Sequence, residues 1–169
     1  GSTWGSTIAI TSNNLQVGAK LFIYGIAGGL GTLYVLLQNC IMLGSFQYFF
    51  HEHGALKESA KGIWMHGVFE IFSMVVEAMA GLILGASLLF PKTYSRFNSF
   101  KLGFKDAFKI FLSTVPFTIM AGIIEGYFTR YALQMPGFLN AFLIFGTLSF
   151  IAFYYFVYPY FVSKKHHEI

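Results

Sequence analysis

Apolar residues in this chain gather into long runs with almost no charge, and short polar stretches separate the runs. A helix needs about 20 predominantly apolar residues to cross the ~30 Å hydrocarbon core of a bilayer. The runs therefore predict membrane-spanning helices at residues 15–38, 62–90, 110–129 and 137–163. A transmembrane β-barrel would show alternating apolar and polar positions, which residues 82–90 lack. We expect an all-α, polytopic helical membrane protein with about four spans, forming a single domain over residues 1–169.

The first apolar stretch is longer than one membrane crossing requires. Residues 21–50 are 30 uncharged residues, which as one helix would be about 45 Å long. The polar positions Gln38, Asn39 and Cys40 lie in this stretch and mark the predicted break. Two arrangements stay open: a re-entrant or interfacial helix after Cys40, or a single tilted helix.

Four ionisable residues lie inside the predicted second and third spans. His66, Glu70 and Glu77 are separated by four and seven residues, so a helix presents them on one face. Glu125 lies near the outer end of the third span. Because a charge in hydrocarbon costs at least ~2.5 kcal/mol, these side chains should form a buried polar cluster that faces protein or water. The opposed directions of the two spans are expected to bring His66, Glu70 and Glu125 to a similar depth, and the sequence leaves their protonation open.

Small residues repeat at four-residue spacing in the same two spans. Gly81 and Gly85 follow the acidic positions of the second span, and Gly122 and Gly126 bracket Glu125 in the third. Such patterns allow helix backbones to approach closely in lipid. We expect these glycines to bring the second and third spans together around the ionisable side chains.

Composition and charge also indicate a membrane protein. Of 169 residues, 56% are hydrophobic, 20% aromatic and only 11% charged, more apolar surface than a soluble domain of this size could bury. The net charge is +4, and eight of the eleven Lys and Arg residues fall on one side of the four-span arrangement. These eight are Lys20, Lys92, Arg96, Lys101, Lys105, Lys109, Lys164 and Lys165, leaving Lys57, Lys61 and Arg130 on the other side. This asymmetry predicts that both chain ends are cytoplasmic, and it explains the positive charge without nucleic acid.

A basic amphipathic helix is predicted in the inner connection, over residues 97–109. Lysines recur every four residues, and phenylalanines form an adjacent stripe. A helix of this kind can lie along the cytoplasmic surface, with its aromatic rings in the acyl boundary and its lysines among anionic lipid headgroups. The alternative is an ordinary positively charged loop that continues into the third span. The residues concerned are Lys101, Lys105 and Lys109, with Phe100, Phe104 and Phe108.

Familiar catalytic and metal-binding patterns are absent from the sequence. It contains no HExxH zinc motif, no GxSxG turn and no aspartate in any predicted span. His51 and His53 could supply two metal ligands, but a site needs more, and a solvated loop is the simpler interpretation. The single cysteine, Cys40, excludes an internal disulfide. The sequence thus predicts no enzyme, no cofactor and no metal site.

Several short motifs, taken in order, resemble one protein family. HGVFE at residues 66–70, GLILG at 81–85, LLFP at 88–91 and AGIIEG at 121–126 follow the opening stretch NNLQVGAKLFIYGIAGGLGTLYVLLQNCIMLG. Together they resemble the stage II sporulation protein M family of bacterial multipass membrane proteins over residues 13–163. Where that family usually has Asn-Gly after the first span, this sequence has Asn39-Cys40.

The resemblance implies a non-enzymatic scaffold in the bacterial cytoplasmic membrane. In spore formers the founding member works with cell-wall hydrolases at the septal membrane, a task that relatives in non-sporulating bacteria need not share. Longer relatives carry a soluble region and another span before this part, and the chain does not begin with methionine, so we expect the C-terminal part of a longer protein. The implied partners are membrane lipids, including anionic lipid, and other membrane or cell-wall-remodelling proteins. A homo-oligomer is an open alternative.

The buried polar cluster allows a second function. As a hydrogen-bonded lock it would fix the register of two spans, although each such contact contributes only ~0.6 kcal/mol. As a pathway it would make the chain a transporter or channel subunit that exchanges protons or binds a cation. A proton route normally needs groups on both sides of the midplane, and the inner half of these spans has none. The sequence therefore favours a lock within a scaffold over transport.

Overall fold

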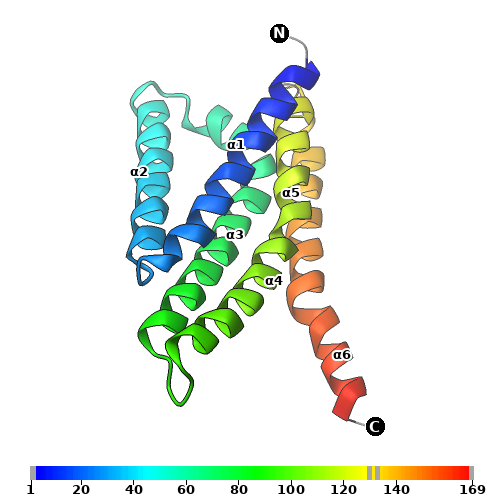
Figure 1. The fold of residues 1–169 in the computed structure, drawn as a ribbon. Coiled ribbons are helices and arrows are strands. Elements are labelled where there is room, and N and C mark those ends of the chain that lie inside the picture. Colours follow the sequence, from blue (N-terminus) through cyan, green and yellow to red (C-terminus); the bar gives the residue numbers. More distant parts are fainter. Residues whose placement is uncertain (1–2, 129–130, 132–133, 168–169) are drawn as a thin grey trace.

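The computed structural model of the chain describes residues 3–128, 131 and 134–167, and every long element in that part is helical (Figure 1). In chain order the elements are α1 (Thr3–Ile23), the 3-10 turn η1 (Tyr24–Ile26), α2 (Leu30–Glu52), α3 (Leu56–Leu89), α4 (Arg96–Ile123), the π-helix η2 (Ile124–Phe128), α5 (Gly137–Ala152), the π-helix η4 (Phe153–Val157) and α6 (Tyr158–His167). The helix α3 is central: it packs against α1, α2, α4 and α5. The first part of the chain thus winds around α3 rather than preceding the bundle.

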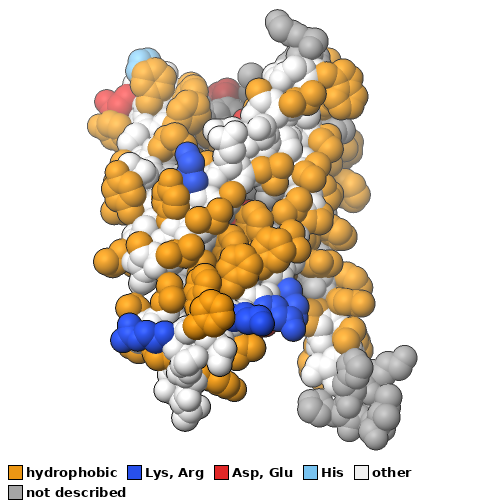
Figure 2. Space-filling view, in the orientation of Figure 1, with side chains coloured by type: hydrophobic (Ala, Val, Ile, Leu, Met, Phe, Trp, Pro, Cys, Tyr) orange, Lys and Arg blue, Asp and Glu red, His pale blue; other side chains and the backbone are white. Residues whose placement is uncertain are grey.

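Four helical stretches in the described part are long and apolar enough to cross a membrane. They are Leu30–Glu52, Leu56–Leu89, Arg96–Tyr127 and Gly137–Lys164. Hydrophobic side chains cover most of the face seen in Figure 2, and most of its Lys and Arg side chains lie toward one end of the bundle. The predicted all-α, multi-span fold class is confirmed, but the first span lies at 30–52 rather than at 15–38.

The break in the first apolar stretch lies earlier than the sequence predicted. Gly28 and Gly29 have φ angles of 65° and 85°, a left-handed conformation that glycine adopts without steric cost. The chain reverses there, and α2 then runs unbroken past Gln38, Asn39 and Cys40. Within α2 the Gln38 amide donates to the Tyr34 hydroxyl, and the Asn39 amide donates to the Val35 carbonyl one turn earlier. The predicted break at 38–40 is therefore wrong, because these polar groups are satisfied within the helix.

The four glycines of the small-residue pattern pack against the first part of the chain, not against each other. A Cβ at Gly81 would meet the backbone of Leu21, and one at Gly85 would meet the backbone of residues 25–29. On α4 and η2, a Cβ at Gly122 would meet Thr11 of α1, and one at Gly126 would meet Thr7 of α1. The expectation that these glycines join the second and third spans directly is wrong. Each pair of glycines leaves a strip of helix surface without side chains, and we call these strips the glycine tracks of α3 (Gly81 and Gly85) and of α4–η2 (Gly122 and Gly126). The chain from α1 to the turn at Gly28 and Gly29 packs against both.

Apolar and aromatic side chains fill the bundle toward the end that carries the α3–α4 connection. Phe22 of α1 is buried with Ala80 and Leu84 of α3 and Ala107 of α4. The Phe22 ring stacks on Phe111, with centroids 5.3 Å apart. This packing closes the space between α1, α3 and α4 below the acidic residues.

The predicted surface helix at 97–109 is not a separate element. It is the first half of α4, which begins at the Ser95 cap and continues without interruption into the span. Its Ser99 hydroxyl donates to the Ser87 carbonyl of α3 at 2.6 Å, and the rings of Phe104 and Phe108 contact Phe22 of α1. The segment therefore docks on the bundle, as in the alternative of a loop that continues into the span. Lys101, Lys105 and Lys109 remain exposed.

The described ends of the chain, Thr3 and His167, lie at opposite ends of the bundle (Figure 1). The prediction that both ends are cytoplasmic did not anticipate this arrangement, and the side of the membrane on which each end lies stays a prediction. The predicted topology placed the first helix at residues 15–38. In the structure, residues 3–23 form α1, which packs along α3 and α4, and α2 is a further helix after it. Arg130, assigned above to the outer cations, lies outside the described residues.

Candidate polar site between helices α1, α3 and α4

His66, Glu70 and Glu125 meet at one point near the end of the bundle that carries the α2–α3 connection. His66 and Glu70 are one turn apart on α3, and their Nε2 and Oε2 atoms are 4.0 Å apart. Glu125 comes from η2, and its Oε2 lies 3.8 Å from the same His66 nitrogen. His66 is only 8% exposed, while the two glutamate side chains are about one-third exposed, at 33% and 31%. The structure thus brings these three groups together.

Glu125 reaches this point from a π-helical turn. The helix α4 ends at Ile123, and residues 124–128 form η2. A π-turn holds one residue more than an α-turn, which rotates the side chains that follow, and such turns are frequent at functional sites. The turn begins two residues after Gly122, where α4 touches Thr11 of α1. The local winding of η2 and the contact with α1 together fix where the Glu125 carboxylate lies.

A cavity of about 370 Å³ lies beside the two carboxylates, lined by Glu70, Glu125 and four residues of α1. The α1 residues are Ala9, Ile10, Asn13 and Asn14. Asn13 and Asn14 are in the middle of α1, although the first predicted span, at residues 15–38, began after them. The Asn14 Nδ2 atom is buried and has no hydrogen-bond partner among the described residues. Neither asparagine was predicted as a site residue, because a polar pair before the first expected span gives no sign of facing Glu70 and Glu125.

Glu77 lies deeper in the bundle than the other three ionisable groups, and it lines a small cavity together with Glu70 and Asn14. It is 2% exposed and accepts hydrogen bonds from the hydroxyls of Thr114, at 2.9 Å, and Thr118, at 3.4 Å. Its carboxylate also packs directly against Gly18 of α1. Thr114 and Thr118, four residues apart on α4, were not predicted as site residues. Their spacing on a face opposite an intramembrane glutamate was the available signal.

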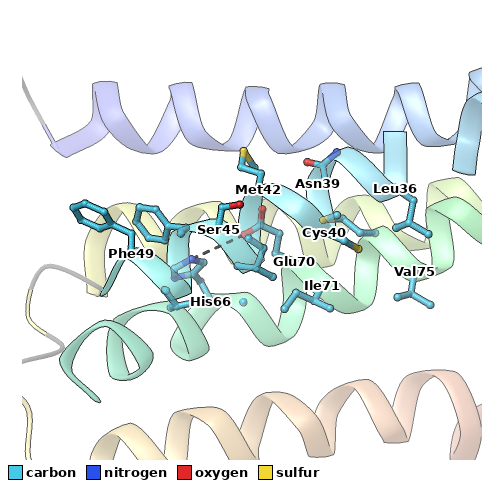
Figure 3. A pocket seen from close by; sticks show the side chains of 15 residues that line it. Leu36, Asn39, Cys40, Met42, Ser45, Phe49, His66, Glu70, Ile71 and Val75 are labelled. Atoms are coloured by element: carbon cyan, nitrogen blue, oxygen red, sulfur yellow. Dashed lines mark ion pairs between the residues drawn. The ribbon is translucent and has the colours of Figure 1, made fainter. Parts of the chain in front are cut away.

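An apolar groove separates α2 from α3 on the other side of His66. It encloses about 650 Å³, and its walls come from residues 36–49 of α2 and residues 63–75 of α3. Figure 3 shows His66 and Glu70 at its floor, facing Met42, Ser45 and Phe49. The groove is therefore an apolar depression on the surface of the bundle, with a polar patch formed by His66 and Glu70.

This arrangement places three ionisable groups together between α3 and η2 beside α1, with a fourth, Glu77, about two turns beyond Glu70 on α3. The described residues around the cavity and the groove include one thiol, Cys40, on an exposed position of α2. His66 and Glu70 line the same groove. Along the described part of α3 the acidic side chains end at Glu77, and the following turns contribute Ala80 and Leu84 to an apolar cluster with Phe22 of α1.

Comparison with known proteins agrees with the fold. A family model described as Stage II sporulation protein M matches residues 1–130, which include α1 to α4 and all four ionisable residues. Neither the curated proteins nor the solved structures contain a match. Since the matched residues make up most of the 169-residue chain, this multi-span membrane protein belongs to the stage II sporulation protein M family.

Proposed function

We propose that this protein is a non-enzymatic membrane scaffold that holds other membrane or cell-wall-remodelling proteins in the bacterial envelope. The observation that carries the proposal is the apolar layer below Glu77. Phe22, Leu84 and Ala107 fill the space between α1, α3 and α4, and a route for protons or ions would need polar groups or water there. A bundle with a polar site at one end and a closed other end suits assembly better than conduction.

The surface of the bundle supports the same proposal. The helix α2 packs only against α1, η1 and α3 within the described part, and most of its large apolar side chains are exposed, including Leu33, Leu37 and Ile41. Membrane helices associate through van der Waals packing and interhelical hydrogen bonds rather than through hydrophobicity alone. The α2–α3 groove, with its polar floor at His66 and Glu70, is the part of this surface best shaped to recognise one partner.

A transporter or channel subunit is the second candidate function. The cavity beside Glu70 and Glu125 favours it, because two carboxylates within a membrane bundle can bind a cation or a proton. Reconstitution of the purified chain in liposomes separates the two functions. A scaffold alone produces no proton or cation flux above empty liposomes, whereas a transport subunit produces flux that Glu70→Gln and Glu125→Gln abolish.

Photocrosslinking in cells tests the scaffold directly. A photoreactive residue at Met42, inside the α2–α3 groove, is expected to form one discrete protein adduct, because a docked partner helix must lie against it. The matched control is Phe145, an exposed apolar position on α5. Lipid adducts alone at both positions would contradict the proposal.

The proposed orientation puts the α3–α4 connection, with Lys92 and Arg96, in the cytoplasm of a bacterial inner membrane, following the positive-inside rule. In a Cys40→Ser background, single cysteines at Gly5 and Lys57 are then expected to react with a membrane-impermeant maleimide added outside, and one at Lys101 is not. Reaction at position 101 alone would reverse the orientation. Different behaviour at positions 5 and 57 would contradict the placement of α1.

A further inference from the structure

The spacing of His66, Glu70 and Glu125 is too long for direct hydrogen bonds. The His66 Nε2 atom lies 4.0 Å from Glu70 Oε2 and 3.8 Å from Glu125 Oε2, whereas charge-assisted hydrogen bonds are ~2.8 Å long. A lock made of these groups alone would draw them into contact. Instead, they surround a small space.

The same spacing is close to that of ligands around a metal ion. Ligand atoms in a tetrahedral zinc site lie ~2.1 Å from the metal and therefore ~3.4 Å from each other. One nitrogen and two carboxylate oxygens of this group all lie within 4.8 Å of one another. Changes in the side-chain torsions of the two partly exposed glutamates that move their carboxylate oxygens by about 1 Å would bring the donors to coordination distance.

The surroundings of the three groups also fit a cation. The His66 ring hydrogen-bonds to the backbone of Gly62, one turn earlier on α3, and a second hydrogen bond of this kind is what orients metal-binding histidines. Two carboxylates and a neutral imidazole carry a charge of −2, which a divalent cation neutralises in a site of low dielectric constant. The cavity of about 370 Å³ beside Glu70 and Glu125 provides an entry path and room for water as a further ligand.

We propose that His66, Glu70 and Glu125 form a binding site for a divalent transition-metal cation of the Zn²⁺ class. An imidazole nitrogen with two carboxylate oxygens selects Zn²⁺ or Mn²⁺ over Mg²⁺ and Ca²⁺, which prefer oxygen ligands alone. The bound ion joins α3 to η2 beside α1. The site does not depend on the proposed scaffold role, since binding can be measured whether or not a partner docks.

The test is equilibrium dialysis of the full chain, purified in mild detergent and stripped of metal, against Zn²⁺, Mn²⁺ and Mg²⁺. We expect one Zn²⁺ ion to bind per chain, and we expect Mg²⁺ to bind with lower affinity. Mutation of residues that only hydrogen-bond to metal ligands lowers metal affinity by ~10–100-fold. Loss of a ligand itself should cost more, so His66→Gln and Glu125→Gln should each lower the Zn²⁺ affinity by at least ~100-fold. Glu125→His, which keeps a ligand, should retain binding within ~10-fold of the parent.

Two controls separate this site from adventitious binding. Replacement of the exposed residues His51 and His53 by alanine should leave Zn²⁺ affinity unchanged. On the unaltered protein, Co²⁺ should show the intense visible bands of low-coordinate geometry and lose them when Zn²⁺ is added. Absence of Zn²⁺ binding, absence of these bands, or binding that survives both His66→Gln and Glu125→Gln would overturn the proposal.

Discussion

Gly85→Ala is expected to weaken the packing of the turn at residues 25–29 against α3 and to destabilise the bundle. A Cβ at Gly85 would lie 2.7 Å from the carbonyl carbon of Gly28 and 2.8 Å from the carbonyl oxygen of Gly25. These are backbone atoms of the turn that reverses the chain, so they cannot rotate away as a side chain would. Overpacking of this kind typically costs ~1–3 kcal/mol, and we expect the upper end of that range.

Unfolding of purified protein by a denaturing detergent measures this effect. Tryptophan fluorescence is a suitable signal because Trp4 of α1 contacts the Tyr127 ring of η2 edge-on, with centroids 5.2 Å apart. Gly44→Ala on α2 is the matched control, since a Cβ there meets nothing within 4 Å and alanine favours a helix by up to ~1 kcal/mol. Equal midpoints for the two variants would refute the close approach at Gly85.

Glu77→Ala is expected to destabilise the bundle by ~2 kcal/mol or more, whereas Glu77→Gln should stay within ~0.6 kcal/mol of the parent. Alanine leaves a cavity where the carboxylate packs against Gly18, and large-to-small changes in cores cost ~2–5 kcal/mol. The hydroxyls of Thr114 and Thr118 lose little, because each also has a backbone acceptor on α4. Glutamine keeps the size and the acceptor oxygen, and single interhelical hydrogen bonds in membranes average ~0.6 kcal/mol.

The same detergent titration checks this pair, with Thr147→Ala as a second reference. Thr147 is a buried polar residue on α5 whose hydroxyl bonds only within its own helix among the described contacts, so its loss should be smaller than that of Glu77→Ala. If Glu77→Gln were as destabilising as Glu77→Ala, the charge of Glu77, rather than its volume, would hold the helices together.

Features carried by local sequence were predictable, and features carried by long-range packing were not. Long apolar runs revealed α3, α4 and α5, because a membrane span needs only composition and length. The i, i+4 spacing of His66 and Glu70 revealed their shared face, and the antiparallel order of two spans placed Glu125 at their depth. These inferences needed no knowledge of which helices touch.

The position of α1 shows where sequence reasoning failed. Its polar residues resemble a solvated opening, and only the contacts of Thr7 and Thr11 with Gly126 and Gly122 reveal that it is packed. Gly28 and Gly29 resemble packing glycines until their positive φ angles show a chain reversal. Likewise, the phenylalanine stripe of 97–109 fits a lipid surface as well as it fits Phe22. In each case amphipathic periodicity identifies a buried face without identifying its partner.

The composition of α1 has a consequence for how the protein is made. Leu30–Glu52 and the three later stretches are apolar enough to enter a bilayer individually, but Thr3–Ile23 does not meet that standard. In two-stage insertion, independently stable helices enter first and associate afterwards. The glycine tracks of α3 and of α4–η2 are synthesised after α1. The helix α1 therefore cannot pack against them until most of the chain has been translated. We expect the ribosome-bound intermediate to keep α1 exposed to proteases until Gly126 has left the translocation machinery.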